Sequence, residues 1–197
     1  GRTYLASGQL KSALNVLEDY LQLSGWDDER YEARLMMGSC YFANGQYDEA
    51  LQAYNDAILE KEVYPDAYLQ KAAVYLEQKE WKKALSNYLL SFQLDMPEGY
   101  TYFNPFNYTR NAFLGLAIAY MNLGKFDEAY KAIHKSLKYD PKYQPALDTE
   151  QLIGQLKEEA DATKAYTNVV KYLLKLKEEE KVPALLGTIP TTLSDDP

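Results

Sequence analysis

Apolar residues recur along the chain at the three- and four-residue spacing of amphipathic helices, and the helical segments come in pairs. The predicted pairs lie near residues 1–23, 31–60, 65–94 and 109–139. A terminal helix is predicted over 143–158, and the segment 159–182 carries a further apolar stripe on one helix face. The stripe consists of Ala162, Ala165, Tyr166, Val169, Val170, Leu173 and Leu174. We therefore expect an amphipathic C-terminal helix that packs on the last repeat.

The pairs are copies of one unit, because three sets of residues recur with the same spacings of 37, 34 and 45. Tyrosines form the first set: Tyr4, Tyr41, Tyr75 and Tyr120. Alanines form the second: Ala13, Ala50, Ala84 and Ala129. The third is glycine with one exception: Gly8, Gly45, Lys79 and Gly124. A common register in all three sets predicts a repeat array. Gly154 stands where the tyrosine set would continue, as expected of an atypical terminal repeat.

The most complete copy reads "LMMGSCYFANGQYDEALQAYNDAI" and shows what each set does. Small residues stand where two helices must approach closely: Gly38, Ala50 and Ala57. Large residues fill the volume between them: Tyr41, Tyr47 and Tyr54. Gly45 lies at the predicted turn, where a positive φ costs glycine least. This pattern resembles the tetratricopeptide repeat (TPR), a helix-turn-helix of 34 residues.

The resemblance implies an all-α fold, a right-handed superhelix of antiparallel helix pairs with C-terminal capping helices. In such repeats the first helix of each pair lines a concave groove. Counting from the tyrosine set, the candidate groove residues are Leu35, Ser39, Phe42, Leu69, Ala73, Leu76, Leu114, Ile118 and Met121. Repeats that grip the C-terminal carboxylate of heat-shock chaperones use lysine, asparagine and arginine there. None is present, so we expect no such carboxylate clamp. An apolar groove must be covered by a protein or peptide partner, a neighbouring domain, or this chain.

A segment rich in aromatic residues, "MPEGYTYFNPFNYT", interrupts the array between the third and fourth pairs. The interval from Tyr75 to Tyr120 exceeds 34 by 11 residues, and the excess falls at 95–108. Its candidate recognition residues are Tyr100, Tyr102, Phe103, Phe106 and Tyr108. Two interpretations stay open: the aromatic side chains cover helix flanks that a regular neighbour would bury, or they recognise a ligand.

Charge and composition limit the classes of partner that we expect the chain to bind. The net charge is −8 and the pI about 4.8, with acidic residues spread along the chain, which disfavours nucleic acid and anionic membranes. Cys40 is the only cysteine, so we expect a buried thiol in a reducing, cytoplasmic setting. The tail 183–197 contains prolines and lacks a helical period, which predicts an extended segment or linker.

Catalytic chemistry requires convergent groups, and few are present. His134 is the only histidine and falls at a predicted outer-helix position, and no glycine-rich phosphate loop occurs. We therefore expect no catalytic residue, no metal and no cofactor in this chain.

Two stretches resemble the repeat region that follows the catalytic module of bacterial and phage family 2 glycosyltransferases. They are the opening "GRTYL" with Trp26 after the first pair, and the "GYTYFNP" insertion. The chain begins inside a helical pattern, so we expect further coding sequence upstream. The resemblance implies a non-catalytic scaffold that positions catalytic modules or holds a protein acceptor. The alternative is a free-standing TPR scaffold that binds a partner helix or extended peptide in its groove.

Overall fold

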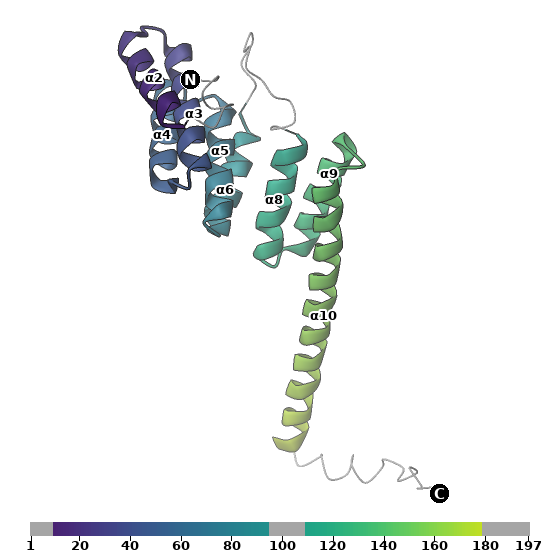
Figure 1. Ribbon diagram of the computed structural model, residues 1–197. Coiled ribbons are helices and arrows are strands. Elements are labelled where there is room, and N and C mark those ends of the chain that lie inside the picture. Colours follow the sequence, from purple (N-terminus) through teal and green to yellow (C-terminus); the bar gives the residue numbers. More distant parts are fainter. Residues whose placement is uncertain (1–9, 95–108, 179–197) are drawn as a thin grey trace, which may run out of the picture. The chain divides into compact units, whose positions relative to one another are not determined.

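The computed structural model describes residues 10–94 and 109–178, and every element in these residues is an α-helix (Figure 1). The first unit of the chain, Gly1–Ile153, holds the helix pairs, and the second is Gly154–Pro197. The helices are α2 (Leu10–Leu23), α3 (Asp27–Ala43), α4 (Tyr47–Glu60), α5 (Pro65–Glu77), α6 (Trp81–Ser91), α8 (Arg110–Asn122), α9 (Phe126–Tyr139) and α10 (Gln144–Glu178). The aromatic insertion and the predicted extended tail lie outside the described residues.

The three complete pairs, α3/α4, α5/α6 and α8/α9, share one turn. In each, the carbonyl of the tyrosine set accepts a hydrogen bond from the backbone N–H five residues later, at 2.8–3.0 Å. The residue before that donor has a left-handed backbone: Gly45 at φ 74°, Lys79 at φ 58° and Gly124 at φ 70°. This is the Schellman arrangement that ends helices. The predicted role of Gly45 is confirmed, and Lys79 adopts the same conformation without being glycine.

The alanine set lies in the core, as its register predicts. Ala13, Ala50, Ala84 and Ala129 are all 0% exposed. Gly38 also sits at a close approach, because a Cβ added there would overlap the ring of Tyr54. Gly115 on α8 has the same relation to Tyr88 on α6. Small residues therefore receive large ones both within a pair and between pairs.

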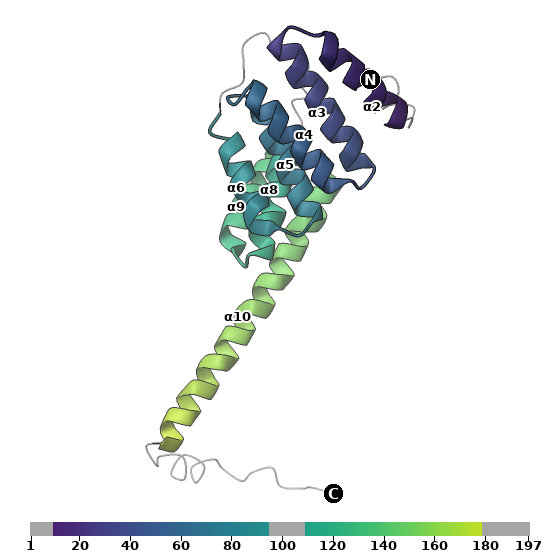
Figure 2. The ribbon, with the colours of Figure 1, turned by 90° about the vertical axis from the view of Figure 1, so that its left-hand side faces the viewer.

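Successive pairs stack side by side, and their first helices α3, α5 and α8 contact one another in order (Figures 1 and 2). One buried contact ties α3 to α5: the N–H of Ala67 donates to the Tyr31 hydroxyl at 3.2 Å. Tyr31 is 0% exposed, and the ring of Tyr64 meets it edge-on at 5.1 Å between centroids. A side chain of one pair thus accepts a hydrogen bond from the first turn of the first helix of the next pair.

Two boundaries differ from the sequence prediction. α3 begins at Asp27, not near residue 31, because three acidic residues occupy its first turn, where the helix dipole favours them although they carry no apolar period. The predicted helices 143–158 and 159–182 form the single helix α10. No proline interrupts 144–178 except at position 145, in its first turn, and one internal glycine does not end a helix.

Candidate functional site

The nine candidate groove residues occupy equivalent positions on α3, α5 and α8. Leu69 and Met121 are buried, at 7% and 8% exposed. The other seven are half-buried: Leu35, Ser39, Phe42, Ala73, Leu76, Leu114 and Ile118. None of the nine is fully exposed. The row is a partly covered surface in which some members belong to the core.

Leu35 and Phe42 show this mixed role. Leu35 packs against two buried clusters, one around Tyr31 and one around Tyr54. Phe42 packs against the second cluster, with its ring 5.9 Å from that of Tyr47. Both side chains join neighbouring repeats and leave only part of their surface for a partner.

Ser39 is the one polar member of the row, and its hydroxyl is already engaged. It donates to the carbonyl of Leu35 at 2.9 Å and lies 3.5 Å from the Tyr54 hydroxyl. Burial raises the pKa of Tyr54 to about 12, and the hydrogen bond with Ser39 offsets this in part. Ser39 therefore supports the repeat core, and the surface offered to a partner is mainly apolar.

A charged network between α3 and α4 was not predicted from the sequence. Glu60 accepts from Arg30 at 2.9 and 3.1 Å and from Arg34 at 3.1 Å. Arg34 also pairs with Asp56 at 3.1 Å. The hydrogen bond from Arg30 is the main reason why the pKa of Glu60 is lowered. Arg30 and Arg34 are four residues apart on α3, and Asp56 and Glu60 are four residues apart on α4. Residues at this spacing share one helix face, so the sequence did contain a signal for the network.

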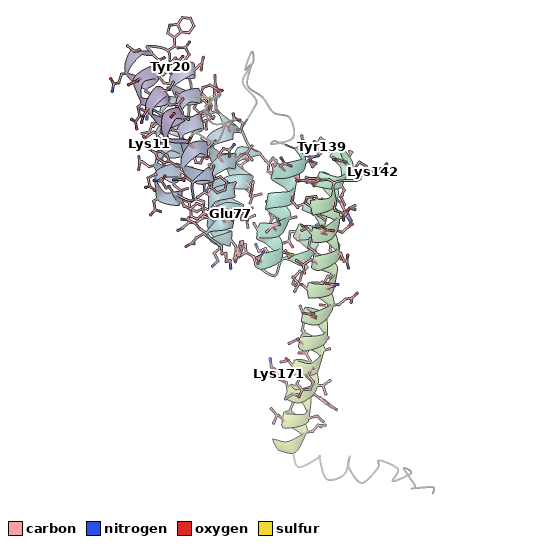
Figure 3. The ribbon with its side chains drawn as sticks, viewed as in Figure 1. Lys11, Tyr20, Glu77, Tyr139, Lys142 and Lys171 are labelled. Atoms are coloured by element: carbon pink, nitrogen blue, oxygen red, sulfur yellow. The ribbon has the colours of Figure 1, made fainter. Side chains whose placement is uncertain are left out.

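An aromatic row crosses three helices near their ends, and it was also missed. The rings of Phe92 and Phe113 stack at 4.7 Å, and those of Phe113 and Tyr139 at 6.2 Å, both at 12° between planes. Phe92 is 38% and Tyr139 54% exposed, and Figure 3 labels Tyr139. The Lys135 ammonium lies 5.2 Å from the centre of the Phe113 ring. These ring contacts link the ends of α6, α8 and α9.

Within the described residues, no group of three or more histidine, cysteine, aspartate or glutamate side chains could hold a metal ion. His134 is exposed, its Nε2 lies 2.6 Å from Glu150 Oε1, and its ring lies 5.9 Å from that of Tyr130. Cys40 is buried with Ala13, Leu17 and Ala33, as predicted. None of the helices in these residues is both long and apolar enough to cross a membrane.

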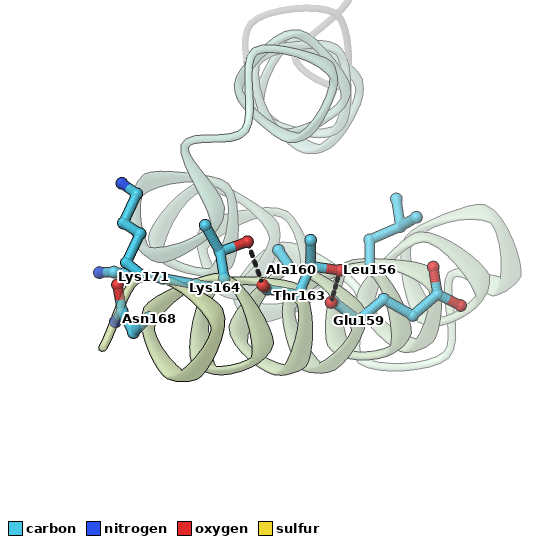
Figure 4. Close-up of a pocket in the computed structure, with 8 residues that line it drawn as sticks. Leu156, Glu159, Ala160, Thr163, Lys164, Asn168 and Lys171 are labelled. Atoms are coloured by element: carbon cyan, nitrogen blue, oxygen red, sulfur yellow. Dashed lines mark hydrogen bonds between the residues drawn. The ribbon is translucent and has the colours of Figure 1, made fainter. Parts of the chain in front are cut away.

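A hollow on the second unit is lined by one helix alone (Figure 4). Its polar wall is regular helix surface: Thr163 donates to the carbonyl of Glu159 at 2.9 Å, and Thr167 to that of Thr163 at 2.8 Å. Lys164 and Lys171 extend along the same face. Ligand sites need groups that converge from several sides, and this face does not provide them.

Comparison with known proteins supports the repeat assignment. Models of the tetratricopeptide repeat match residues 4–63 and 111–143. The Hsp70-Hsp90 organising protein of Plasmodium falciparum is 31% identical over 108 residues, which cover 53% of this chain and 18% of that protein. Protein unc-45 homolog B of Xenopus tropicalis is 26% identical over 120 residues, 59% of this chain and 12% of that protein. The chain therefore spans less than a fifth of either relative.

Solved structures show the same fold at low identity. MamA 41-end from Desulfovibrio magneticus RS-1 gives a TM-score of 0.64 at 19% identity, covering 90% of this chain and 91% of that one. The first TPR of Spaghetti (RPAP3), bound to an HSP90 peptide, gives 0.56 at 24% identity, covering 66% and 97%. The chain is thus a solenoid of helix pairs, and the segments 4–63 and 111–143 are tetratricopeptide repeats.

Proposed function

We propose that this chain is a non-catalytic scaffold that holds an apolar segment of a partner protein along α3, α5 and α8. The observation that supports it most is the row of equivalent positions on three contacting helices, eight of them apolar and seven only half-buried. Apolar surface in such a row is the usual seat of a helix or an extended peptide. A cytoplasmic location is proposed with it, because the single cysteine is buried and reduced.

Peptide selection against the purified chain tests this function. Peptides selected from a random library should lose at least about tenfold in affinity for Leu76→Lys and Ile118→Lys, because each change buries a charge against an apolar ligand. Leu89→Lys is the matched control, since Leu89 is 40% exposed on α6, outside the row. Circular dichroism confirms that the variants stay folded. Selected peptides that bind Leu76→Lys and Ile118→Lys as tightly as they bind Leu89→Lys would contradict the proposed surface.

Because the row carries no cationic side chain, it also predicts a class of peptide that should not bind. The P. falciparum relative is named as an Hsp70-Hsp90 organiser, and the Spaghetti structure holds the peptide SRMEEVD. None of the nine positions here carries a cationic side chain to meet a terminal carboxylate. We therefore expect no binding of SRMEEVD at concentrations up to about 1 mM by calorimetry. Saturable binding that is lost when the peptide is C-terminally amidated would show that a carboxylate clamp exists after all.

The association with a family 2 glycosyltransferase is a finer prediction and rests on the "GRTYL" and "GYTYFNP" stretches alone. In that setting the row would be covered by a neighbouring module or a protein acceptor. Sequencing the whole reading frame decides this point. An α/β nucleotide-binding domain encoded in frame upstream of Gly1 would support it, and a start codon followed by a complete first helix would exclude it.

A further inference from the structure

Four large apolar side chains of the first unit are exposed far more than the others. Leu23 is 86%, Leu59 85%, Trp26 74% and Val63 63% exposed. No other large apolar side chain described in this unit exceeds 54%. We call these four side chains the edge patch. None of them belongs to the candidate row, so the proposed function leaves them unexplained.

The edge patch comes from two connections between neighbouring pairs. Leu23 ends α2 and Trp26 directly precedes α3, while Leu59 lies in the last turn of α4 and Val63 in the link to α5. Both connections lie at the edge of the array opposite the turns that close each pair (Figures 1 and 2). The four side chains therefore share one edge although they are up to 40 residues apart in the sequence.

Two residues of α3 hold these connections together. Arg30 donates to the carbonyl of Leu21 at 3.2 Å and to Glu60 at 2.9 Å. Asp28 lies 3.1 Å from the Lys61 ammonium. Each member of the edge patch is within two residues of one of these contacts. The patch is thus one surface and not a scatter of single apolar residues, and such a surface marks an interaction site.

The surroundings of the edge patch are acidic. Segments 23–30 and 59–64 contain five carboxylates and two cations, a net charge of −3. Both cations are already paired with carboxylates of the same segments. Asp27, Glu29 and Glu62 carry the excess, and all three are exposed. The positive end of the α3 dipole offsets only about half a charge. An apolar partner that also carries positive charge is therefore favoured here.

We propose that the edge patch binds a segment of a partner protein in which apolar side chains are flanked by lysine or arginine. The apolar side chains cover the patch, and the cations meet Asp27 and Glu62. Trp26 is the expected anchor, because tryptophan buries a large area and is enriched among the residues that dominate binding. Pairing with the edge patch of a second copy is disfavoured, because both patches carry the same negative charge.

Two peptide libraries, selected against the full chain, test the partner's chemistry. Each has five random apolar positions, flanked on both sides by two lysines in one library and by two glutamates in the other. We expect lysine-flanked binders with a Kd of roughly 1–100 µM, because the interface is small. The same sequences with glutamate flanks should bind at least about tenfold more weakly at low salt. Equal binding of both versions overturns the proposal. So does a lack of binders, the result expected if another part of this chain covers the patch.

Paired substitutions test the location. Trp26→Ser with Leu59→Ser should weaken the selected peptides at least about tenfold. Leu89→Ser with Leu90→Ser is the matched control, because these side chains are 40% and 39% exposed on α6, where residues 81–93 contain no carboxylate. The control should change affinity by less than about twofold, and so should Leu76→Lys in the candidate row. Circular dichroism confirms that the variants are folded. Equal loss in both serine pairs, or loss only in Leu76→Lys, overturns the proposal.

A second pair of variants tests the charges. Asp27→Asn with Glu62→Gln should weaken lysine-flanked peptides by about three- to tenfold at roughly 50 mM salt and by less than about twofold at roughly 500 mM, because salt screens exposed charges. Asp127→Asn with Glu128→Gln removes the same charge from the first turn of α9 and should have less than a twofold effect at either salt concentration. Equal weakening by both pairs would show attraction to the whole acidic chain and not to the edge patch, which overturns the proposal.

Discussion

The repeat array and the distal half of α10 use the same kinds of residue in opposite ways. In the array a large side chain meets a small one from the same chain: the Tyr54 ring fills the space above Gly38, and Tyr88 fills that above Gly115. On α10, Tyr166 and Leu173 are exposed although small residues alternate with them along the same face. Both regions have helical periodicity. The difference shows that periodicity identifies a helix face, whereas matched large and small positions identify what the face packs against.

The largest expected effect on stability is the difference between removing a tyrosine of the array and removing a tyrosine of α10. Tyr54→Ala should lower the free energy of unfolding by about 3–5 kcal/mol, because Tyr54 is 0% exposed and its removal leaves a cavity. Tyr166→Ala should change it by less than about 0.5 kcal/mol, because Tyr166 is 73% exposed. Denaturant titrations of the two variants provide the measurement. Similar losses in both would remove the distinction between the two regions.

Alkaline titration probes the buried tyrosines of the array alone. The folded-state pKa of Tyr54 is about 12, and burial raises the pKa values of Tyr31 and Tyr88 as well. The unfolded value is near 10, so the folded state retains more protons above that pH. Stability is therefore complete below pH 10 and falls as pH rises through the folded pKa, by about 1.4 kcal/mol per pH unit for each tyrosine.

Absorbance at 295 nm, followed together with unfolding, measures this effect. Tyr54→Phe is the control: it should reduce the slope between pH 10 and 12 by about 1.4 kcal/mol per pH unit. A free energy of unfolding that stays constant from pH 9 to 12 would show that these hydroxyls are not buried in solution.

The two glycine contacts sharpen the comparison within the array. Gly38→Ala and Gly115→Ala should each cost about 1–3 kcal/mol through overpacking. Tyr88→Phe should recover part of the Gly115→Ala loss, because the nearest atom to the added Cβ is the Tyr88 hydroxyl. Tyr54→Phe should recover none of the Gly38→Ala loss, because there the nearest atoms are ring carbons.

Gly25 supplies the control for these substitutions. A Cβ at Gly25 meets nothing within 4 Å, so Gly25→Ala should change stability by less than about 0.5 kcal/mol. Recovery by both phenylalanine changes, or by neither, would mean that the helices shift to relieve the overlap. Thermal unfolding of the single and double variants separates these outcomes.

The smallest effect on stability is expected at the turn between α5 and α6. Lys79 has φ 58°, the conformation that Gly45 and Gly124 adopt in the equivalent turns. Lys79→Gly should raise the free energy of unfolding by about 0.5–1 kcal/mol, because glycine takes this conformation without steric cost. Gly45→Ala should lower it by a similar amount. A destabilised Lys79→Gly variant would mean that the lysine side chain stabilises the turn by more than the backbone strain costs.

Much of the array was predictable from the sequence. The alanine set is buried, and Gly45, Lys79 and Gly124 have the left-handed turn, because both features follow from contacts that recur from repeat to repeat. The first turn of α3 was not predictable from apolar spacing, because Asp27, Asp28 and Glu29 face water. The nine positions of the candidate row lie on α3, α5 and α8, the first helices of the three pairs, and their role in binding stays a prediction. Leu69 and Met121 are buried, and the spacing within one helix carries no information about how deeply each position lies.

The hydrogen bond from Ala67 to the Tyr31 hydroxyl bears on how the array assembles. α5 has no side-chain cap of its own, so this donor in its first turn has its hydroxyl acceptor only after α3 has formed. The α3/α4 pair is then coupled to the α5/α6 pair, and a fragment that starts at Pro65 lacks an acceptor that the intact chain supplies. Unfolding of the array should accordingly proceed in few cooperative steps, with the α3/α5 boundary among the last to separate.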